Sequence, residues 1–251
     1  MYLPPASPEQ SADHEFPIEV VELVRAAAGD EMVRRTWIEA AWWEEDPTEL
    51  AIGRPVRAEG ASPRRVTYVA IDALAFQRPR ASLDPLILDL VPKLQERGYT
   101  AYGHFDGLLE IAPPAYERGW TSPSSPETLF LTVIQAKDPY EPLRIHGPGN
   151  VAILVKDLIR ALEGWRLFSS FEIAVADNQV LELAFRSLPS DLDTFAKAVY
   201  KLNPEAVYKV FLGDLVDGWD TLDYIRATDS QTPDDLVQSL QRSKRLRLFW
   251  E

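Results

Sequence analysis

The chain has 251 residues, of which 46% are hydrophobic and 26% are charged, and it contains no cysteine. The lack of cysteine excludes disulfides, thiol nucleophiles and Cys-based zinc or iron–sulfur sites. The 39 acidic and 26 basic residues give a net charge of −13. Because phosphate backbones and anionic membranes attract positively charged surfaces, we expect neither nucleic acid nor a membrane as a partner.

The first segment, residues 1–15, is rich in proline and serine, which predicts a disordered tail. It has no basic stretch followed by an apolar run, so it does not have the pattern of a signal peptide. No stretch of the chain approaches the roughly 20 apolar residues that a membrane span needs. We therefore expect a cytoplasmic protein.

Two helices are predicted after the tail. Residues 18–28 carry an apolar stripe at helical spacing, and Gly29 follows where a helix C-cap is expected. Asp30 is a favourable N-cap for a second helix, which we predict to run through Trp37 to about Glu45.

The middle of the chain then contains the same order of predicted elements twice. The first copy has a strand at 66–71, a proline-containing loop and an amphipathic helix over 83–94. A hairpin follows, with arms at 99–105 and 108–112 around an Asp-Gly turn. Pro92 is expected to kink or shorten the helix, because proline lacks the amide hydrogen that a helix interior needs.

The second copy has a strand at 128–134, a longer loop at 137–149 and a helix that Asn150 is expected to cap. Its hairpin arms are predicted at 171–175 and 180–184. The apolar residues of the two helices share one spacing, which favours two related halves. The alternative is chance, because amphipathic helices followed by hairpins are common.

The rest of the chain has no counterpart upstream. We predict a helix capped by Ser190, a short helix that starts at Asn203 and a helix that begins near Pro233. An acidic stretch over 213–235 and a final strand over 245–250 complete the elements.

These elements predict an α+β fold. It consists of two related strand-helix-hairpin halves that form one or two mixed or antiparallel sheets with packed helices, behind an N-terminal helical segment. The chain divides into the tail at 1–15, a segment at 16–121 that holds the helices and the first half, and a C-terminal α/β domain at 125–251.

The C-terminal half resembles a known family. The resemblance rests on the strand residues Leu181-Glu182-Leu183, on a Tyr-x-x-x-Pro segment at 200–204, and on a final helix and Trp-containing strand over 236–251. Residues 128–251 resemble the mainly bacterial domain of unknown function 4253. The chain departs from that family at Asn203, where members often have cysteine, and in a longer acidic stretch. The resemblance implies an α+β domain and no particular activity.

Two histidines are candidates for chemistry. His104 is predicted on a strand, two residues before Asp106, and Glu110 could face it across the hairpin. A histidine with two carboxylates can bind a metal or transfer a proton, although a plain strand-face histidine beside a turn is the alternative. His146 precedes a Gly-Pro-Gly segment that can cradle an anion or simply form a turn. The third histidine, His14, lies in the tail.

The acidic stretch is the candidate partner-binding site. Aspartates recur there at every third residue with two aromatic residues among them, which does not match a calcium-binding loop. The pattern is typical of a recognition loop with aromatic anchors, or of a solvated acidic insertion. The residues concerned are Asp214, Asp217, Trp219, Asp220, Asp223 and Tyr224. No metal site and no cofactor are predicted.

The sequence favours a non-catalytic, acidic protein-binding function. Our hypothesis is a bacterial immunity or antitoxin-type protein that binds a basic toxin or effector, since opposite charges speed association. The alternatives are a hydrolase-type enzyme that uses His104 or His146 with nearby carboxylates, and a regulatory interaction module. If the two histidines lie apart in the fold, the hydrolase alternative fails.

Overall fold

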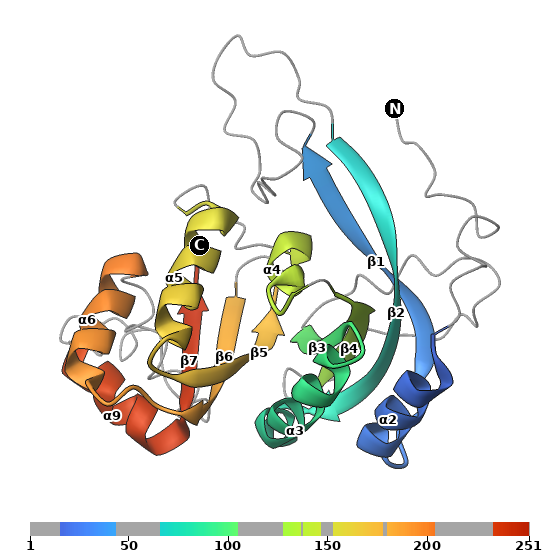
Figure 1. Ribbon diagram of the computed structural model, residues 1–251, viewed down its shortest axis with the longest axis horizontal. Helices are drawn as coiled ribbons and strands as arrows, with labels where there is room; N and C mark the ends of the chain where they lie inside the picture. The colour runs from blue at the N-terminus through green and yellow to red at the C-terminus, as the bar shows by residue number, and fades with distance from the viewer. Residues whose placement is uncertain are drawn as a thin grey trace, which may run out of the picture.

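The computed structural model describes residues 16–43, 66–104, 128–136, 138–146, 153–177, 180–203 and 233–250 (Figure 1). The predicted α+β class with an N-terminal helix is confirmed. In chain order, the helices and strands are α2 (Ile18–Ala28), β1 (Arg34–Trp43), β2 (Val66–Pro79), η1 (Arg80–Ser82), α3 (Leu83–Gln95), β3 (Tyr99–His104), β4 (Thr128–Gln135), α4 (Glu141–His146), α5 (Val155–Arg166), β5 (Ser170–Ala176), β6 (Val180–Ser187), α6 (Leu192–Leu202), α9 (Pro233–Ser243) and β7 (Arg245–Phe249).

The described strands form one seven-stranded mixed sheet in the order β1-β2-β4-β3-β5-β6-β7. Neighbouring strands are antiparallel except β3 and β5, which run parallel with Gly103 opposite Val175. Strand β4 of the second predicted copy lies between β2 and β3 of the first. The two copies therefore share one sheet, and their relatedness stays a prediction.

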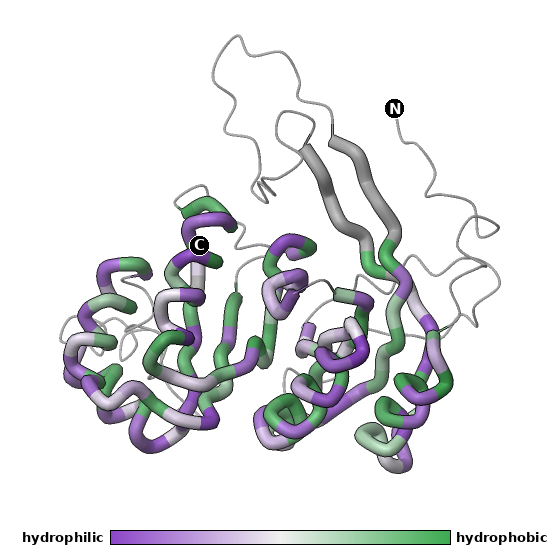
Figure 2. Tube along the Cα trace, in the orientation of Figure 1, coloured by the Kyte–Doolittle hydropathy of each residue, from purple (hydrophilic) through white to green (hydrophobic). Residues whose placement is uncertain are grey.

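Helices cover both faces of the sheet (Figure 1). Helices α2 and α3 pack on one face, against apolar side chains such as Phe76 and Leu131. Helices α4, α5, α6 and α9 pack on the other, against side chains such as Tyr102 and Phe185. In Figure 2 the central strands are largely hydrophobic, whereas the helices alternate between hydrophobic and hydrophilic residues, as a one-sided packing requires.

The predicted second helix, from Asp30 to about Glu45, is wrong. This segment forms β1, which pairs antiparallel with β2 from Arg34 opposite Ala75 to Trp43 opposite Val66. Strand β2 in turn extends to Pro79, where a loop was expected after residue 71, because its second half also pairs with β4. Strand pairing between distant segments overrides local helix preference here.

Three further boundaries differ from the predictions. The expected loop over 137–149 contains α4, and the helix that follows it begins at Val155. Asn150, its expected cap, lies outside the described residues. The cap of α6 is Asp191 rather than Ser190, since the Asp191 carboxylate accepts a hydrogen bond from the Thr194 amide. Helix α9 and the final strand are confirmed.

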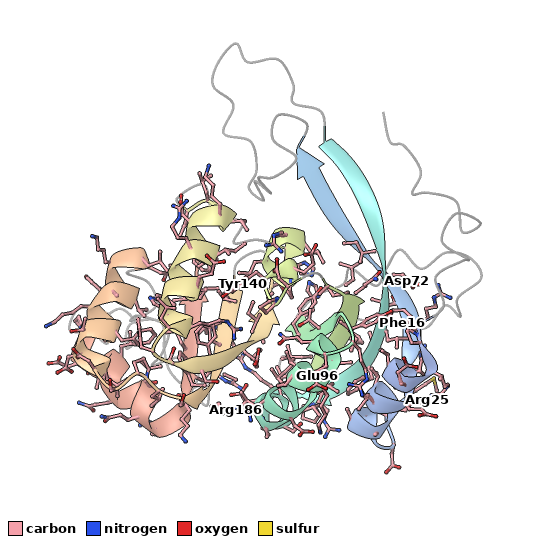
Figure 3. All side chains as sticks on the ribbon, in the orientation of Figure 1. Phe16, Arg25, Asp72, Glu96, Tyr140 and Arg186 are labelled. Atoms are coloured by element: carbon pink, nitrogen blue, oxygen red, sulfur yellow. The ribbon has the colours of Figure 1, made fainter. Side chains whose placement is uncertain are left out.

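Helix α3 passes through Pro92 and continues to Gln95, so the predicted shortening does not occur. Proline cannot donate to the carbonyl four residues earlier, that of Leu88. Arg186 of β6 donates a side-chain hydrogen bond to this carbonyl oxygen instead. Figure 3 shows Arg186 next to α3. The missing helix bond is therefore replaced by a bond to the sheet.

Several predictions fall outside the described residues. These are the tail at 1–15, the return strand at 108–112, the short helix after Asn203 and most of the acidic stretch.

Candidate functional site at the carboxyl end of strand β3

A group of polar side chains is buried where β3 ends. Tyr102 and His104 lie two residues apart on β3 and therefore on the same face of the sheet. His146 is the last residue of α4, which packs on that face, and Asp177 directly follows β5. Because β3 and β5 are parallel, their carboxyl ends lie at the same edge. We call these four residues the histidine cluster.

The two histidines are in ring contact. The centroids of the His104 and His146 rings are 4.6 Å apart, and the Tyr102 hydroxyl lies 2.7 Å from His146 Nε2 in a hydrogen bond. His104 Nε2 lies 3.8 Å from a carboxylate oxygen of Asp177. This separation is longer than a hydrogen bond but close enough for a strong charge interaction when His104 is protonated.

Burial divides the cluster into an inner and an outer pair. Tyr102 is fully buried and His146 is 2% exposed, whereas His104 is 6% exposed and the Asp177 side chain is 16% exposed. The inner pair is held by its own hydrogen bond. The outer pair forms the edge of the cluster that solvent reaches.

Gly103 allows the close packing that positions the cluster. A Cβ atom at this residue would lie 2.9 Å from a methyl carbon of Leu83 and 3.0 Å from the carbonyl oxygen of Ala174. Both distances are shorter than normal van der Waals contact, so any side chain at Gly103 would push β3 away from β5 and α3. Tyr102 and His104 flank this glycine, so their positions depend on it.

The inner pair is neutral at physiological pH. Burial lowers the pKa of His146 well below its ordinary value of 6.5, and the neighbouring His104 lowers it further. Burial raises the pKa of the Tyr102 hydroxyl well above 10, and the charge of Asp177 raises it further. The low-polarity surroundings thus disfavour the charged form of each group. Which of the two donates in their hydrogen bond depends on the tautomer of His146.

This arrangement supports proton transfer. No three His, Asp or Glu side chains among the described residues are placed to hold one metal ion. An imidazole next to a carboxylate, by contrast, is the usual pair for general acid–base chemistry, because the carboxylate orients the ring and stabilises its protonated form.

The structure therefore brings together the two histidines that the sequence singled out separately. Asp106 and Glu110, the carboxylates expected beside His104, lie outside the described residues. Asp177 and Tyr102 were missed as site residues. Asp177 lies between the two predicted hairpin arms, and no local pattern indicates that this connection lies beside the end of β3.

The six residues of the predicted acidic partner site, Asp214, Asp217, Trp219, Asp220, Asp223 and Tyr224, all lie outside the described residues. Comparison of the chain with models of protein families, with curated proteins and with solved structures found no match. Within the described ranges, no helix has the length and apolar character required to cross a membrane.

Proposed function

We propose that the protein is a hydrolase-type enzyme and that the histidine cluster transfers the proton in its reaction. The proposal is supported by one observation: His104 and His146, from separate elements, are in ring contact beside Asp177. In α/β sheets, active sites commonly lie at the carboxyl ends of parallel strands, as this cluster does at the ends of β3 and β5.

In this proposal the outer pair performs the reaction. Asp177 lies beside Nε2 of His104, and in this proposal the His104 imidazole accepts a proton from water. The resulting hydroxide attacks the carbonyl carbon of an ester or amide, and the bond to the leaving group breaks. The leaving group then takes the proton back from the His104 imidazolium, which Asp177 stabilises in the meantime.

The inner pair positions the outer one. His146 is neutral and hydrogen-bonded to Tyr102, so its ring offers His104 an uncharged, fixed neighbour. A fixed ring keeps His104 in a single orientation, and a general base gains rate from such fixed geometry.

The test is hydrolysis of a panel of chromogenic esters and anilides by the full chain and two variants. His104→Gln is expected to lower kcat/KM by about 10²- to 10⁴-fold, the usual contribution of a general base. His14→Gln is the matched control, since it removes the histidine that lies outside the cluster, and it should leave the rate unchanged. Melting temperatures of both variants check folding. No hydrolysis by the wild type, or equal rates for His104→Gln and wild type, would overturn the proposal.

A second candidate function is binding of a basic protein such as a toxin or effector. The net charge of −13 favours it, because opposite charges steer association. The residues proposed for contact are Asp214, Asp217, Trp219, Asp220, Asp223 and Tyr224. An affinity capture from the native host, repeated with the four aspartates changed to asparagine, tests it. Recovery of the same proteins by both baits, or of none, would contradict this function.

A further inference from the structure

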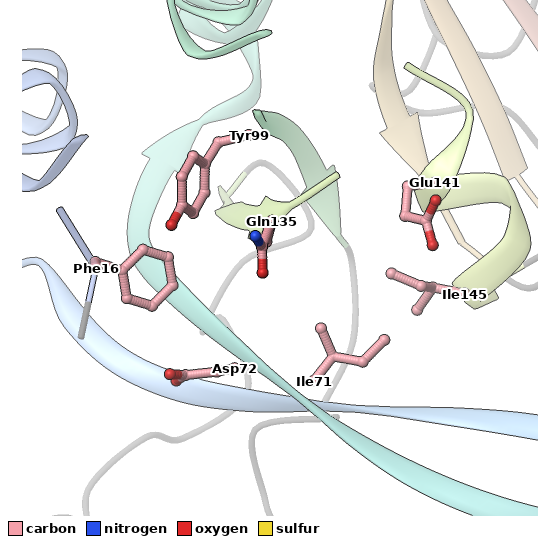
Figure 4. Close-up of a pocket in the computed structure, with 7 residues that line it drawn as sticks. All are labelled: Phe16, Ile71, Asp72, Tyr99, Gln135, Glu141 and Ile145. Carbon is pink, nitrogen blue, oxygen red and sulfur yellow. The ribbon is translucent and has the colours of Figure 1, made fainter. Parts of the chain in front are cut away.

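A pocket lies at the other end of β3 from the histidine cluster. It has a volume of about 240 Å³ and is lined by Phe16, Ile71, Asp72, Tyr99, Gln135, Glu141 and Ile145. Tyr99 is the first residue of β3, and Glu141 is the first residue of α4. Figure 4 shows Phe16 and Tyr99 on one side of the space, Glu141 and Ile145 on the other, and Gln135 between them. We call it the α4 pocket.

The apolar part of the lining consists of two aromatic rings and two isoleucines. The rings of Phe16 and Tyr99 lie 5.6 Å apart with an interplanar angle of 39°. The volume equals that of about eight water molecules at roughly 30 Å³ each, so a small ligand or one long side chain would fill it. Aromatic faces attract cations as well as apolar groups.

The charged part of the lining is acidic, because two of the seven residues are carboxylates and none is basic. The charge of Asp72 is compensated, because the Arg35 guanidinium donates hydrogen bonds to both of its carboxylate oxygens. Glu141 pairs with Arg144, which also pairs with Asp138. Arg144 lies 2.7 Å from Asp138 and 3.1 Å from Glu141, so one cation faces two carboxylates there. Among the described residues, this leaves a surplus negative charge at the Glu141 side of the pocket.

The phenol of Tyr99 also lies in a negative potential, which comes from Asp72 and Glu19. Burial raises its pKa above 10, and the charges of Asp72 and Glu19 raise it further. Nearby carboxylates raise the pKa of a phenol because they disfavour a second negative charge. The same potential would stabilise a positive charge brought into the pocket.

We propose that the α4 pocket binds a compact cation, an ammonium or guanidinium group on a short apolar body. The apolar body packs between the two aromatic rings and the isoleucines, and the cation lies against Glu141. The amide of Gln135, an exposed residue that lines the pocket, can hydrogen-bond to the ligand. This site is separate from the histidine cluster, so it goes beyond the proposed hydrolase function. A free amine and the side chain of a lysine or arginine in a peptide share this chemistry.

The test compares a cation with its uncharged counterpart by titration calorimetry on the full chain. We expect 2-phenylethylamine to bind about tenfold more tightly than 2-phenylethanol, the difference that a cation–π contact and one carboxylate contribute. Capped lysine and arginine amides are titrated in parallel. Tighter binding of these amides than of the free amine assigns the pocket to a peptide side chain, and the reverse order assigns it to a small amine.

Two variants and one control test whether the ligands bind in the α4 pocket. Glu141→Gln should weaken 2-phenylethylamine severalfold and leave 2-phenylethanol unchanged. Glu163→Gln, which removes an exposed carboxylate on α5, is the matched control and should change neither. Phe16→Leu should weaken both ligands, and an unchanged melting temperature shows that it still folds. Equal affinities for the amine and the alcohol, no binding of any cation at millimolar concentration, or equal losses in the two glutamate variants would overturn the proposal.

Discussion

The sheet buries polar groups on its two faces in different ways. On the face covered by α4 and α5, the inner pair of the histidine cluster, Tyr102 and His146, is buried and neutral at physiological pH. On the face covered by α3, Glu182 is fully buried as a carboxylate among three arginines, Arg80, Arg245 and Arg247. We call these four residues, together with Asp84, the arginine cluster.

The arginine cluster holds distant elements together. Glu182 lies on β6, Arg245 and Arg247 lie on the edge strand β7, and Arg80 lies between β2 and α3. Arg245 also lies 2.6 Å from Asp84 of α3. Three cations thus meet two anions, and Glu182 has all three arginines as partners, whereas Asp84 pairs with Arg245. Such a group is costly to break, because removal of one member leaves the others buried without compensation.

The histidine cluster is suited to proton transfer, whereas the arginine cluster is suited to holding the fold together. Guanidinium groups do not lose their protons in proteins, so the arginine cluster cannot transfer one. An imidazole, by contrast, can gain or lose a proton near neutral pH, and the histidine cluster places that of His104 beside a carboxylate. Burial alone therefore does not indicate function, whereas buried groups that can change their charge do.

Removal of the buried anion should have the largest effect on stability. We expect Glu182→Gln to lower the free energy of unfolding by about 3 kcal/mol, because three arginines then repel one another without their shared carboxylate. Glu172→Gln on β5 is the matched control. Burial raises the pKa of Glu172, and its one arginine contact is 3.4 Å long, so its loss should cost under about 1 kcal/mol. Urea unfolding measures both, and equal losses would contradict the comparison.

The inner pair of the histidine cluster should give the next largest effect. Tyr102→Phe removes the partner of His146 Nε2 and leaves a buried nitrogen unsatisfied, which costs about 2 kcal/mol. Tyr99→Phe removes the same atom from the opposite face of β3, where it lines the α4 pocket, and should cost under about 0.5 kcal/mol. Thermal unfolding of the two variants distinguishes them. A larger loss in Tyr99→Phe would show that the cluster is not a stabilising unit.

The pH dependence of stability should distinguish the histidine cluster from the arginine cluster. His146 binds a proton below pH 6.5 when unfolded, but its lowered pKa prevents this in the folded chain. Its contribution is therefore complete above pH 6.5 and falls by about 1.4 kcal/mol per pH unit below it. The groups that face it are His104, Tyr102 and, beyond His104, Asp177.

His146→Gln should remove that slope between pH 6.5 and 5.5, as measured by denaturant unfolding at each pH. Glu172 acts in the opposite direction, because its raised pKa adds stability as the pH falls through the folded-state pKa toward 4.5, and this gain is complete below 4.5. The difference between wild type and variant isolates His146 from this contribution. Parallel curves for the two proteins would show that His146 is protonated in the folded chain.

The bond between Arg186 and the Leu88 carbonyl should have the smallest effect. Arg186→Ala is expected to cost about 1 kcal/mol in the wild type. In a Pro92→Ala background the helix supplies its own amide to this carbonyl, so the same change should cost little. A double-mutant cycle measures the coupling. Additive effects would mean that Arg186 does not compensate for the proline.

Local sequence patterns predicted the elements whose structure depends on neighbours in the chain. The helix at 18–28, the body of α3 and the helix that begins at Pro233 follow from apolar spacing and capping residues. The hairpin strands β5 and β6 follow from alternation around a turn. In each case the residues that stabilise the element lie within a few positions of one another, so the sequence contains the necessary information in one stretch.

The histidine cluster could not be predicted from local sequence patterns. Its members depend on β1 and β2 pairing along their length, on β4 lying next to β3, and on β5 lying parallel to β3. These pairings join segments that are far apart in the chain, and their free energy comes from hydrogen bonds and side-chain packing between strands. His104 was singled out by its residue type, but its contacts with His146 and Asp177 exist only because the fold places three separate chain segments at one edge of the sheet.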